Sequence, residues 1–299
     1  MGIQNIAANH STKASPSTAE GLYLDLLKKC LTRTLFANTD EYQATKPPRV
    51  QHALVVRTGI KKIRDRFGPP VHALLMKRAR YVYIYVYIML QRTFNPWPVK
   101  AETMIGMERL DNLQDCITDV LRCRVPGDLI ETGVWRGGAT IFMRAVLKAY
   151  GDTARTVWAA DSFRGLPKPD VQRAPADKGD VHWAFGALAI PVEEVQANFA
   201  RYGLLDDQVR FLVGWFRDTL PTAPIEQLAI LRLDGDLYES TTDALYALYP
   251  KLSIGGYVIV DDYHLPPCRA AIHEYRAKHG ITEQIVSIDE GSVFWRRLE

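Results

Sequence analysis

The fold of this chain is decided by residues 128–140, DLIETGVWRGGAT, in which an apolar run leads straight into a glycine-rich turn. Asp128 to Thr132 has the length and character of a buried strand, and a helical pattern follows from Gly138 to Tyr150. In a doubly wound sheet, ligands bind outside the carboxyl ends of the strands, beside the first strand. Glycines such as Gly133 and Gly137 let backbone approach a ligand there. The stretch lacks the full G-x-G-x-x-G of dinucleotide-binding proteins, and a plain strand-to-helix turn is the alternative.

The alternation of strand and helix continues to the C-terminus, which implies a parallel sheet covered on both faces. Further strands are expected at 156–161, 209–213, 228–234 and 256–261, and helices or helical turns at 192–202, 216–220, 241–252 and 267–279. The last two strands, 283–288 and 292–297, are joined by DEG at 289–291, which is hairpin chemistry. We therefore predict an α/β fold of the class I methyltransferase plan: a Rossmann-like, doubly wound, seven-stranded sheet that ends in an antiparallel hairpin.

The chain before residue 101 lacks this alternation of strands and helices. Residues 1–16 are polar, and we expect a disordered tail. A helix is expected to begin at Ser17, which has the spacing of a capping box with Glu20. We interpret residues 17–100 as an N-terminal helical, basic region that serves as a lid or in oligomerisation, and residues 101–299 as the catalytic domain.

A basic block lies within that N-terminal region. Between Lys46 and Lys100 there are 12 Lys or Arg against one acid, Asp65, and the apolar run Tyr81 to Leu90 is too short to span a bilayer as a helix, which takes roughly 20 residues. A surface helix pair that packs on the catalytic domain or a partner subunit is the favoured interpretation. The alternatives are a peripheral membrane patch facing anionic lipid and a nucleic-acid site, for which no recognisable module is present.

The composition is that of a soluble globular protein, with 47% apolar and 24% charged residues. The four cysteines form no C-x-x-C pair and are too sparse for a disulfide framework: Cys30, Cys116, Cys123 and Cys268. No signal-peptide pattern is present at the N-terminus. We expect a cytoplasmic protein.

Acids and aromatics follow the first three strands. Glu131 is a negatively charged group that suits the cationic methionine end of S-adenosylmethionine. Its presence argues against a pyrophosphate-binding loop, which would avoid negative charge. Asp161, at the end of the second strand, can accept both ribose hydroxyls of an adenosine cofactor, or can merely cap a turn. Trp215 and Phe216, after the third strand, are candidates to flank the adenine or to belong to the core. The predicted cofactor set also includes Thr132, Gly133, Arg136, Gly137, Ser162, Gly214 and Asp234.

Four aspartates end the fourth and fifth strands, in LDGD at 233–236 and VDDYH at 260–264. The two strands are neighbours in this topology, so Asp234, Asp236, Asp261 and Asp262 should lie within a few ångströms. Like charges this close repel one another. A hard divalent cation that takes oxygen ligands, Mg²⁺, would remove the repulsion. The alternative is that the acids cap loops and face solvent. A metal makes a hydroxyl more acidic, and a carboxylate left free can take its proton. Spacing alone leaves open which aspartate stays free, and His264 is a second candidate base.

At these motifs the chain resembles the macrocin O-methyltransferase family, whose members methylate sugar hydroxyls on macrolide and aminocoumarin antibiotics. The matching stretches are TMIGMERL (103–110), IETGVWRGG (130–138), ADSF (160–163), NFARYGLL (198–205), LRLDGD (231–236) and IVDDY (259–263). The resemblance implies dependence on S-adenosylmethionine and Mg²⁺, often as a dimer, with metal ligands Asp234, Asp261 and Asp262 and the base Asp236. It also places the 103–107 stretch over the cofactor as part of a lid, which adds Thr103, Met104 and Ile105 to the cofactor set.

We therefore expect an O-methyltransferase that acts on a sugar hydroxyl of a glycosylated natural product or glycolipid, as a homodimer or higher homo-oligomer and without nucleic acid. Peripheral membrane contact through the basic block is the alternative location. A phenol or catechol acceptor and a non-catalytic scaffold of the same fold are the rival functions, although four uncompensated acids have no evident use in a scaffold. The long stretch at 164–191 is interpreted as the second wall of the acceptor site.

Overall fold

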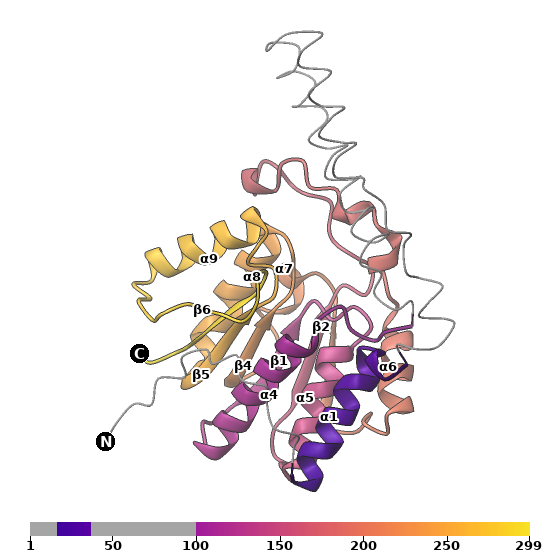
Figure 1. Cartoon of the computed structure of the whole chain (residues 1–299). Helices are drawn as coiled ribbons and strands as arrows, with labels where there is room; N and C mark the ends of the chain where they lie inside the picture. The colour runs from indigo at the N-terminus through magenta and orange to yellow at the C-terminus, as the bar shows by residue number, and fades with distance from the viewer. Residues whose placement is uncertain (1–16, 37–99) are drawn as a thin grey trace, which may run out of the picture.

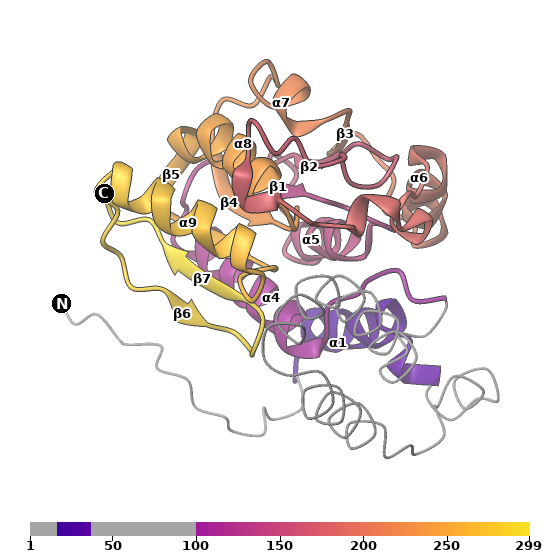
Figure 2. The same ribbon diagram turned by 90° about the horizontal axis from the view of Figure 1, so that it is seen from above.

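The computed structural model describes residues 17–36 and 100–299, which form a single sheet with helices on both faces (Figures 1 and 2). The seven strands lie in the order β3-β2-β1-β4-β5-β7-β6. Strands β1 to β5 pair in parallel, whereas β7 runs antiparallel to β5 and β6 antiparallel to β7. The bounds are β1 Asp128–Thr132, β2 Val157–Asp161, β3 Val209–Val213, β4 Leu228–Leu233, β5 Leu252–Val260, β6 Val286–Ser287 and β7 Val293–Arg296. The predicted class I plan with its C-terminal hairpin is confirmed.

Two apolar cores lie on the two faces of the sheet. The helices of the first core are α1 Ala19–Leu31, α4 Met107–Arg122, α5 Gly138–Ala149 and α6 Val192–Arg201. Those of the second are α8 Tyr238–Leu248 and α9 Pro266–Lys278, with the short α7 Phe216–Thr219 beside α8. Helix α1 buries Leu24, Leu27 and Leu31 in the first core beside α5, which is why its leucines recur at helical spacing (Figure 1).

Several predictions fall on the rest of the chain. The predicted tail at 1–16 and the basic block, with its apolar run at 81–90, lie outside the described residues, and the proposed domain boundary at residue 100 stays a prediction. Within 17–36 and 100–299, no helix is both long enough and apolar enough to cross a membrane.

The predicted cap of the first helix is wrong by one residue. The N-cap is Thr18 rather than Ser17, and its Oγ1 accepts a hydrogen bond from the backbone N–H of Gly21 at 3.1 Å. A Ser-Thr pair offers two similar capping hydroxyls, and sequence spacing alone does not separate them. Helix α4 was not predicted as an element, although Leu110, Leu113 and Ile117 recur along it at helical spacing and are buried.

The helix expected at 241–252 is misplaced. It spans Tyr238–Leu248 and is followed by a 3-10 turn, Tyr249–Lys251, so that β5 begins at Leu252. The early start has a tertiary cause, because the carboxylate of Asp177 accepts the backbone N–H groups of Tyr238 at 2.7 Å and Glu239 at 3.0 Å. The C-terminal hairpin is also shorter than predicted, since β6 is only Val286–Ser287.

Gly133 directly follows β1, at a position where a side chain would not fit. Its φ is +95°, and a Cβ atom built there would collide with the backbone oxygen of Asp234, at the end of β4. The backbone of β1 therefore passes directly against the strand that carries the acids.

We expect Gly133→Ala to destabilise the protein far more than Gly151→Ala. Gly151 also has a positive φ, +69°, but an added Cβ there meets nothing within 4 Å, so its substitution should lower the free energy of unfolding by only about 1–2 kcal/mol. Gly133→Ala adds a backbone collision to that strain. Urea denaturation measures both, and equal losses would contradict the steric argument.

Candidate active site

A cavity opens beyond the carboxyl ends of β1, β2 and β4, where a doubly wound sheet binds its ligands. Its lining is Met104, Gly133, Trp135, Asp161, Ser162, Gly165, Leu166, Pro167, Leu188, Trp215, Phe216, Arg217, Asp234, Gly235, Asp236, Glu239, Ser240 and Asp243. The predicted cofactor residues in it are Met104, Gly133, Asp161, Ser162, Trp215 and Asp234. The others lie outside the lining, and their cofactor contacts stay predictions: Thr103, Ile105, Glu131, Thr132, Arg136, Gly137 and Gly214.

The 103–107 stretch, which is predicted to be part of a lid, follows residues that are held against the glycine-rich turn. The N–H of Gly138 donates to the carbonyl of Glu102 at 2.9 Å, and a Cβ at Gly138 would lie 2.5 Å from the Cβ of Thr103. Arg136 adds a hydrogen bond to the carbonyl of Ala101 at 3.1 Å. These contacts place Met104, which follows Thr103, in the cavity wall. The absence of a side chain at Gly138 therefore allows residues 102 and 103 to approach the turn closely.

Asp161 caps a turn and lines the cavity at once. One carboxylate oxygen accepts the backbone N–H of Val134 and the other that of Phe163, each at 2.7 Å. Burial raises the pKa of Asp161, and these backbone hydrogen bonds act in the opposite direction. The carboxylate therefore fixes the backbone after β1 and after β2, and the predicted contact with ribose hydroxyls would come from the same group.

The apolar part of the lining comes from two further segments. Leu166, Pro167 and Leu188 belong to the long 164–191 stretch, whose end is tied to the turn by a hydrogen bond from Trp135 Nε1 to the carbonyl of Ala187 at 2.9 Å. Trp215 and Phe216, after β3, also line the cavity. A pocket walled by aromatic and aliphatic side chains suits a planar base, and the adenine contact of Trp215 stays a prediction.

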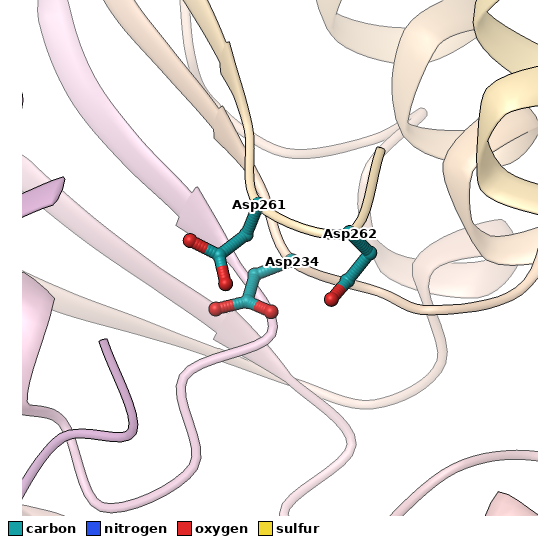
Figure 3. Close-up of side chains that lie close together, drawn as sticks. All are labelled: Asp234, Asp261 and Asp262. Carbon is teal, nitrogen blue, oxygen red and sulfur yellow. The ribbon is translucent and has the colours of Figure 1, made fainter. Parts of the chain in front are cut away.

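Three of the four predicted acids meet at the ends of β4 and β5. Asp234, Asp261 and Asp262 each offer a carboxylate oxygen, and these oxygens lie within 4.8 Å of one another. Figure 3 shows the carboxylates of Asp234 and Asp261 side by side, with Asp262 at the same edge. Burial and the negative charges of Asp236 and Asp234 raise the pKa of Asp262 well above its usual range. The cluster thus lacks positive charge on the Asp262 side.

Asp236 lies in the cavity lining beside this cluster. Its backbone N–H donates to Asp262 Oδ2 at 2.9 Å, and its φ of +57° is an uncommon conformation for a residue with a side chain. Burial raises the pKa of Asp236 to about 7, while the charge of His182 opposes this rise and that of Asp234 adds to it. Asp236 is thus bonded to the cluster through its backbone, but its carboxylate is not one of the three that converge.

Sequence reasoning missed the arginines of the site. Arg232, on β4, is 1% exposed and donates to Glu131 and Asp234 at 2.6 Å each and to Asp261. Burial acts to lower the pKa of Arg232, but its three carboxylate partners raise that pKa above its usual value. The signal was a lone arginine inside an otherwise apolar strand, LAILRL, because a buried charge requires partners.

Glu131 lies beneath the cavity rather than in its wall. It is 2% exposed, accepts hydrogen bonds from Arg232 and from the hydroxyl of Thr140, and burial raises its pKa to about 8. Its predicted place near the methionine end of the cofactor stays a prediction.

Arg109, in the first turn of α4, approaches the cluster from the helical side. Its guanidinium donates to Asp261 Oδ2 and Asp289 Oδ2, each at 2.6 Å. Gly291 makes room for it, because a Cβ there would lie 2.6 Å from Arg109 Nη2. His264 is exposed next to this turn and donates its backbone N–H to the Gly291 carbonyl at 3.0 Å. Asp236 lines the cavity and His264 does not, and the role of base stays a prediction for either residue.

The 164–191 stretch is anchored by charged groups that sequence reasoning did not single out. Arg173 forms ion pairs with Glu239 and Asp243 of α8, and Asp177 caps the same helix. Near its middle, His182 Nδ1 lies 2.6 Å from Asp180 Oδ2, and the charge of His182 acts on Asp236. The stretch is thus fastened to the edge of the cavity, as a wall requires.

Comparison with known proteins identifies the family of the chain. The family model described as Macrocin-O-methyltransferase (TylF) matches residues 20–297, which is nearly the whole chain. The chain belongs to this family.

Relatives within the family have named acceptors. The chain is 46% identical over 286 residues to the mycinamicin III 3''-O-methyltransferase of Micromonospora griseorubida, covering 95% of this chain and 99% of that one. It is 61% identical over 201 residues to the 8-demethyl-8-(2,3-dimethoxy-alpha-L-rhamnosyl)-tetracenomycin-C 4'-O-methyltransferase of Streptomyces olivaceus, covering 67% and 77% of the two chains. The solved structure of the O-methyltransferase NovP matches with a TM-score of 0.73 at 44% identity, over 94% of this chain and 100% of that chain.

Membership in the family confirms the prediction of an O-methyltransferase, and the class I fold implies S-adenosylmethionine as the methyl donor. The cavity fits such a donor, because it combines the half-buried acid Asp161 with the aromatic wall at 215–216. The acid cluster also fits a hard divalent cation: its donors are all oxygens, and Asp262 is a buried carboxylate among like charges. The residues that would hold the ion are Asp234, Asp261 and Asp262.

We expect Asp161→Asn to weaken cofactor binding by about 10–100-fold, because an amide replaces one of two acceptor oxygens and leaves a buried N–H unpaired. Isothermal titration with S-adenosylhomocysteine measures this change. Asp170→Asn is the matched control, since Asp170 is an exposed loop acid that accepts N–H groups only from its own turn, at Gln172 and Arg173. Equal affinities of wild type and Asp161→Asn would contradict the placement of the cofactor.

Proposed function

We propose that this protein is a Mg²⁺-dependent O-methyltransferase that methylates a sugar hydroxyl of a glycosylated small molecule. The observation that carries the magnesium part is the convergence of three carboxylate oxygens within 4.8 Å beside a cavity that Asp234 and Asp236 both line. The sugar part is supported by the relatives, of which one is named for a rhamnosyl compound and one for mycinamicin III.

The residues of the site divide the work. When bound, a divalent cation supplies Lewis-acid polarisation, which makes an alcohol more acidic. Asp236, beside the cluster, takes the proton of the acceptor hydroxyl. The oxygen then forms a bond to the methyl carbon, the carbon–sulfur bond breaks with its electron pair going to sulfur, and neutral S-adenosylhomocysteine is released. The anchored 164–191 stretch orients the acceptor and excludes water.

We expect Asp236→Asn to lower kcat by about 10²–10⁴-fold, because an amide cannot take the proton. The affinity for S-adenosylhomocysteine should stay unchanged, which titration checks. His264→Gln is the control, and its rate should be close to that of the wild type. Near-normal turnover in Asp236→Asn would move the base to another residue.

Metal removal should abolish activity reversibly. We expect the enzyme to lose turnover in EDTA and to regain it with Mg²⁺, and Asp262→Asn to need a higher Mg²⁺ concentration for half-maximal rate, because one oxygen ligand is lost. Rates measured across a Mg²⁺ titration test both statements. Full activity in EDTA would show that the acids serve another purpose.

The acceptor class is tested by offering glycosides, their aglycones and catechols to the same enzyme. We expect turnover of glycosides only, with the product's methyl group on a sugar oxygen by mass spectrometry and NMR. Turnover of catechols without glycosides would instead favour the phenol-type alternative. Homo-oligomer formation, peripheral membrane contact and a cytoplasmic location stay predictions.

A further inference from the structure

Arg232 lies beneath the acid cluster and has no part in the reaction as proposed. Its guanidinium, 1% exposed, donates to Glu131 and Asp234 at 2.6 Å each and also to Asp261. The three acids come from β1, from the end of β4 and from the end of β5. One buried cation therefore joins three adjacent strands at the edge where the cavity opens.

The strand register puts Arg232 there. It pairs with Glu131 across β1 and β4, and with Ile259 across β4 and β5. Side chains alternate between the faces of a sheet, so Asp234, two residues after Arg232, and Asp261, two residues after Ile259, share its face. The arginine is thus one row below the two acids.

The same two acids, Asp234 and Asp261, belong to the proposed metal ligands. The planar fork of an arginine presents five N–H donors in a fixed geometry and can hold several carboxylates in place, whereas a lysine has three donors on a flexible stem. Arg232 keeps the acids compensated in the absence of metal. However, two positive groups that share ligands at short range repel each other.

We propose that Arg232 is an internal counter-ion of the metal site, which holds Asp234 and Asp261 in place before metal binds and, by its own charge, lowers the affinity of the site for Mg²⁺. This inference rests on the proposed magnesium site. Arg109 supports it from the other side, because it occupies the second oxygen of Asp261 at 2.6 Å while remaining partly exposed.

The test is calorimetric titration of Mg²⁺ into metal-free protein without cofactor or acceptor. Arg232→Gln should bind Mg²⁺ about tenfold or more tightly than the wild type, because one repelling charge is gone. Its thermal midpoint without metal should fall by roughly 10 °C, because buried carboxylates lose their partner. Arg232→Lys keeps the charge and should bind Mg²⁺ within about threefold of the wild type.

Arg144 supplies a matched control. It is 5% exposed on α5 and donates to Asp206 at 2.6–3.1 Å, away from the cavity lining. Arg144→Gln should also lower the thermal midpoint, since it removes a buried arginine from its carboxylate partner, although that partner, Asp206, is exposed. It should leave the Mg²⁺ affinity unchanged. If the role of Arg232 were purely structural, both Gln variants would lower the thermal midpoint and neither would change the Mg²⁺ affinity.

The outcomes separate this inference from the proposed function. If the wild type binds Mg²⁺ and Arg232→Gln binds it equally or more weakly, the counter-ion role is wrong while the metal site stands. If the wild type binds none, the magnesium proposal is wrong and this inference falls with it. Should Arg232→Gln fail to fold, the comparison is made in a Glu131→Gln background, where one acid fewer needs compensation, and the tighter binding is expected there too.

Discussion

The site depends on one electrostatic constraint: carboxylates gathered at the ends of adjacent strands must have positive charge beside them. Arg232 supplies it from within β4, and Arg109 from the start of α4. Leaving buried carboxylates without a cation would be strongly destabilising. The arginines are therefore part of the fold as well as of the site, and the strand register that places Arg232 also fixes where the acids lie.

The two arginines compensate the acids of the cluster unequally. Asp261 has an arginine on each oxygen, whereas Asp262 receives a single backbone N–H from Asp236. Within residues 17–36 and 100–299, Asp262 and Asp236 form no ion pair with an arginine or lysine, and Asp236 lines the cavity. A cation bound at the cluster would compensate the charge of Asp262, which has no arginine partner among the described residues, and the acceptor hydroxyl would lie near Asp236.

The 164–191 stretch is held at the edge of the cavity by contacts between distant segments. Asp177 and Arg173, from a stretch without long elements, fasten themselves to the first turns of α8. The same contacts explain why α8 begins earlier than its apolar pattern predicts, since a carboxylate from another part of the chain caps it. A loop that caps a helix of the sheet is held in place, and a held loop can orient an acceptor.

Periodicity, glycines and strand-end acids sufficed to predict the seven-stranded plan, the hairpin and the meeting of Asp234, Asp261 and Asp262, because these follow from local pattern and from the topology of doubly wound sheets. The same information could not give the partners of Arg232 or the cap on α8. Except for Asp234, which is two residues after Arg232, these partners lie more than 25 positions away in the chain, and side-chain directions that only the packed sheet defines bring them together. Which acids reach the edge of the sheet follows from the residues at the strand ends. Which of these acids are neutralised follows only from the packed fold, because charge compensation depends on distances across strands.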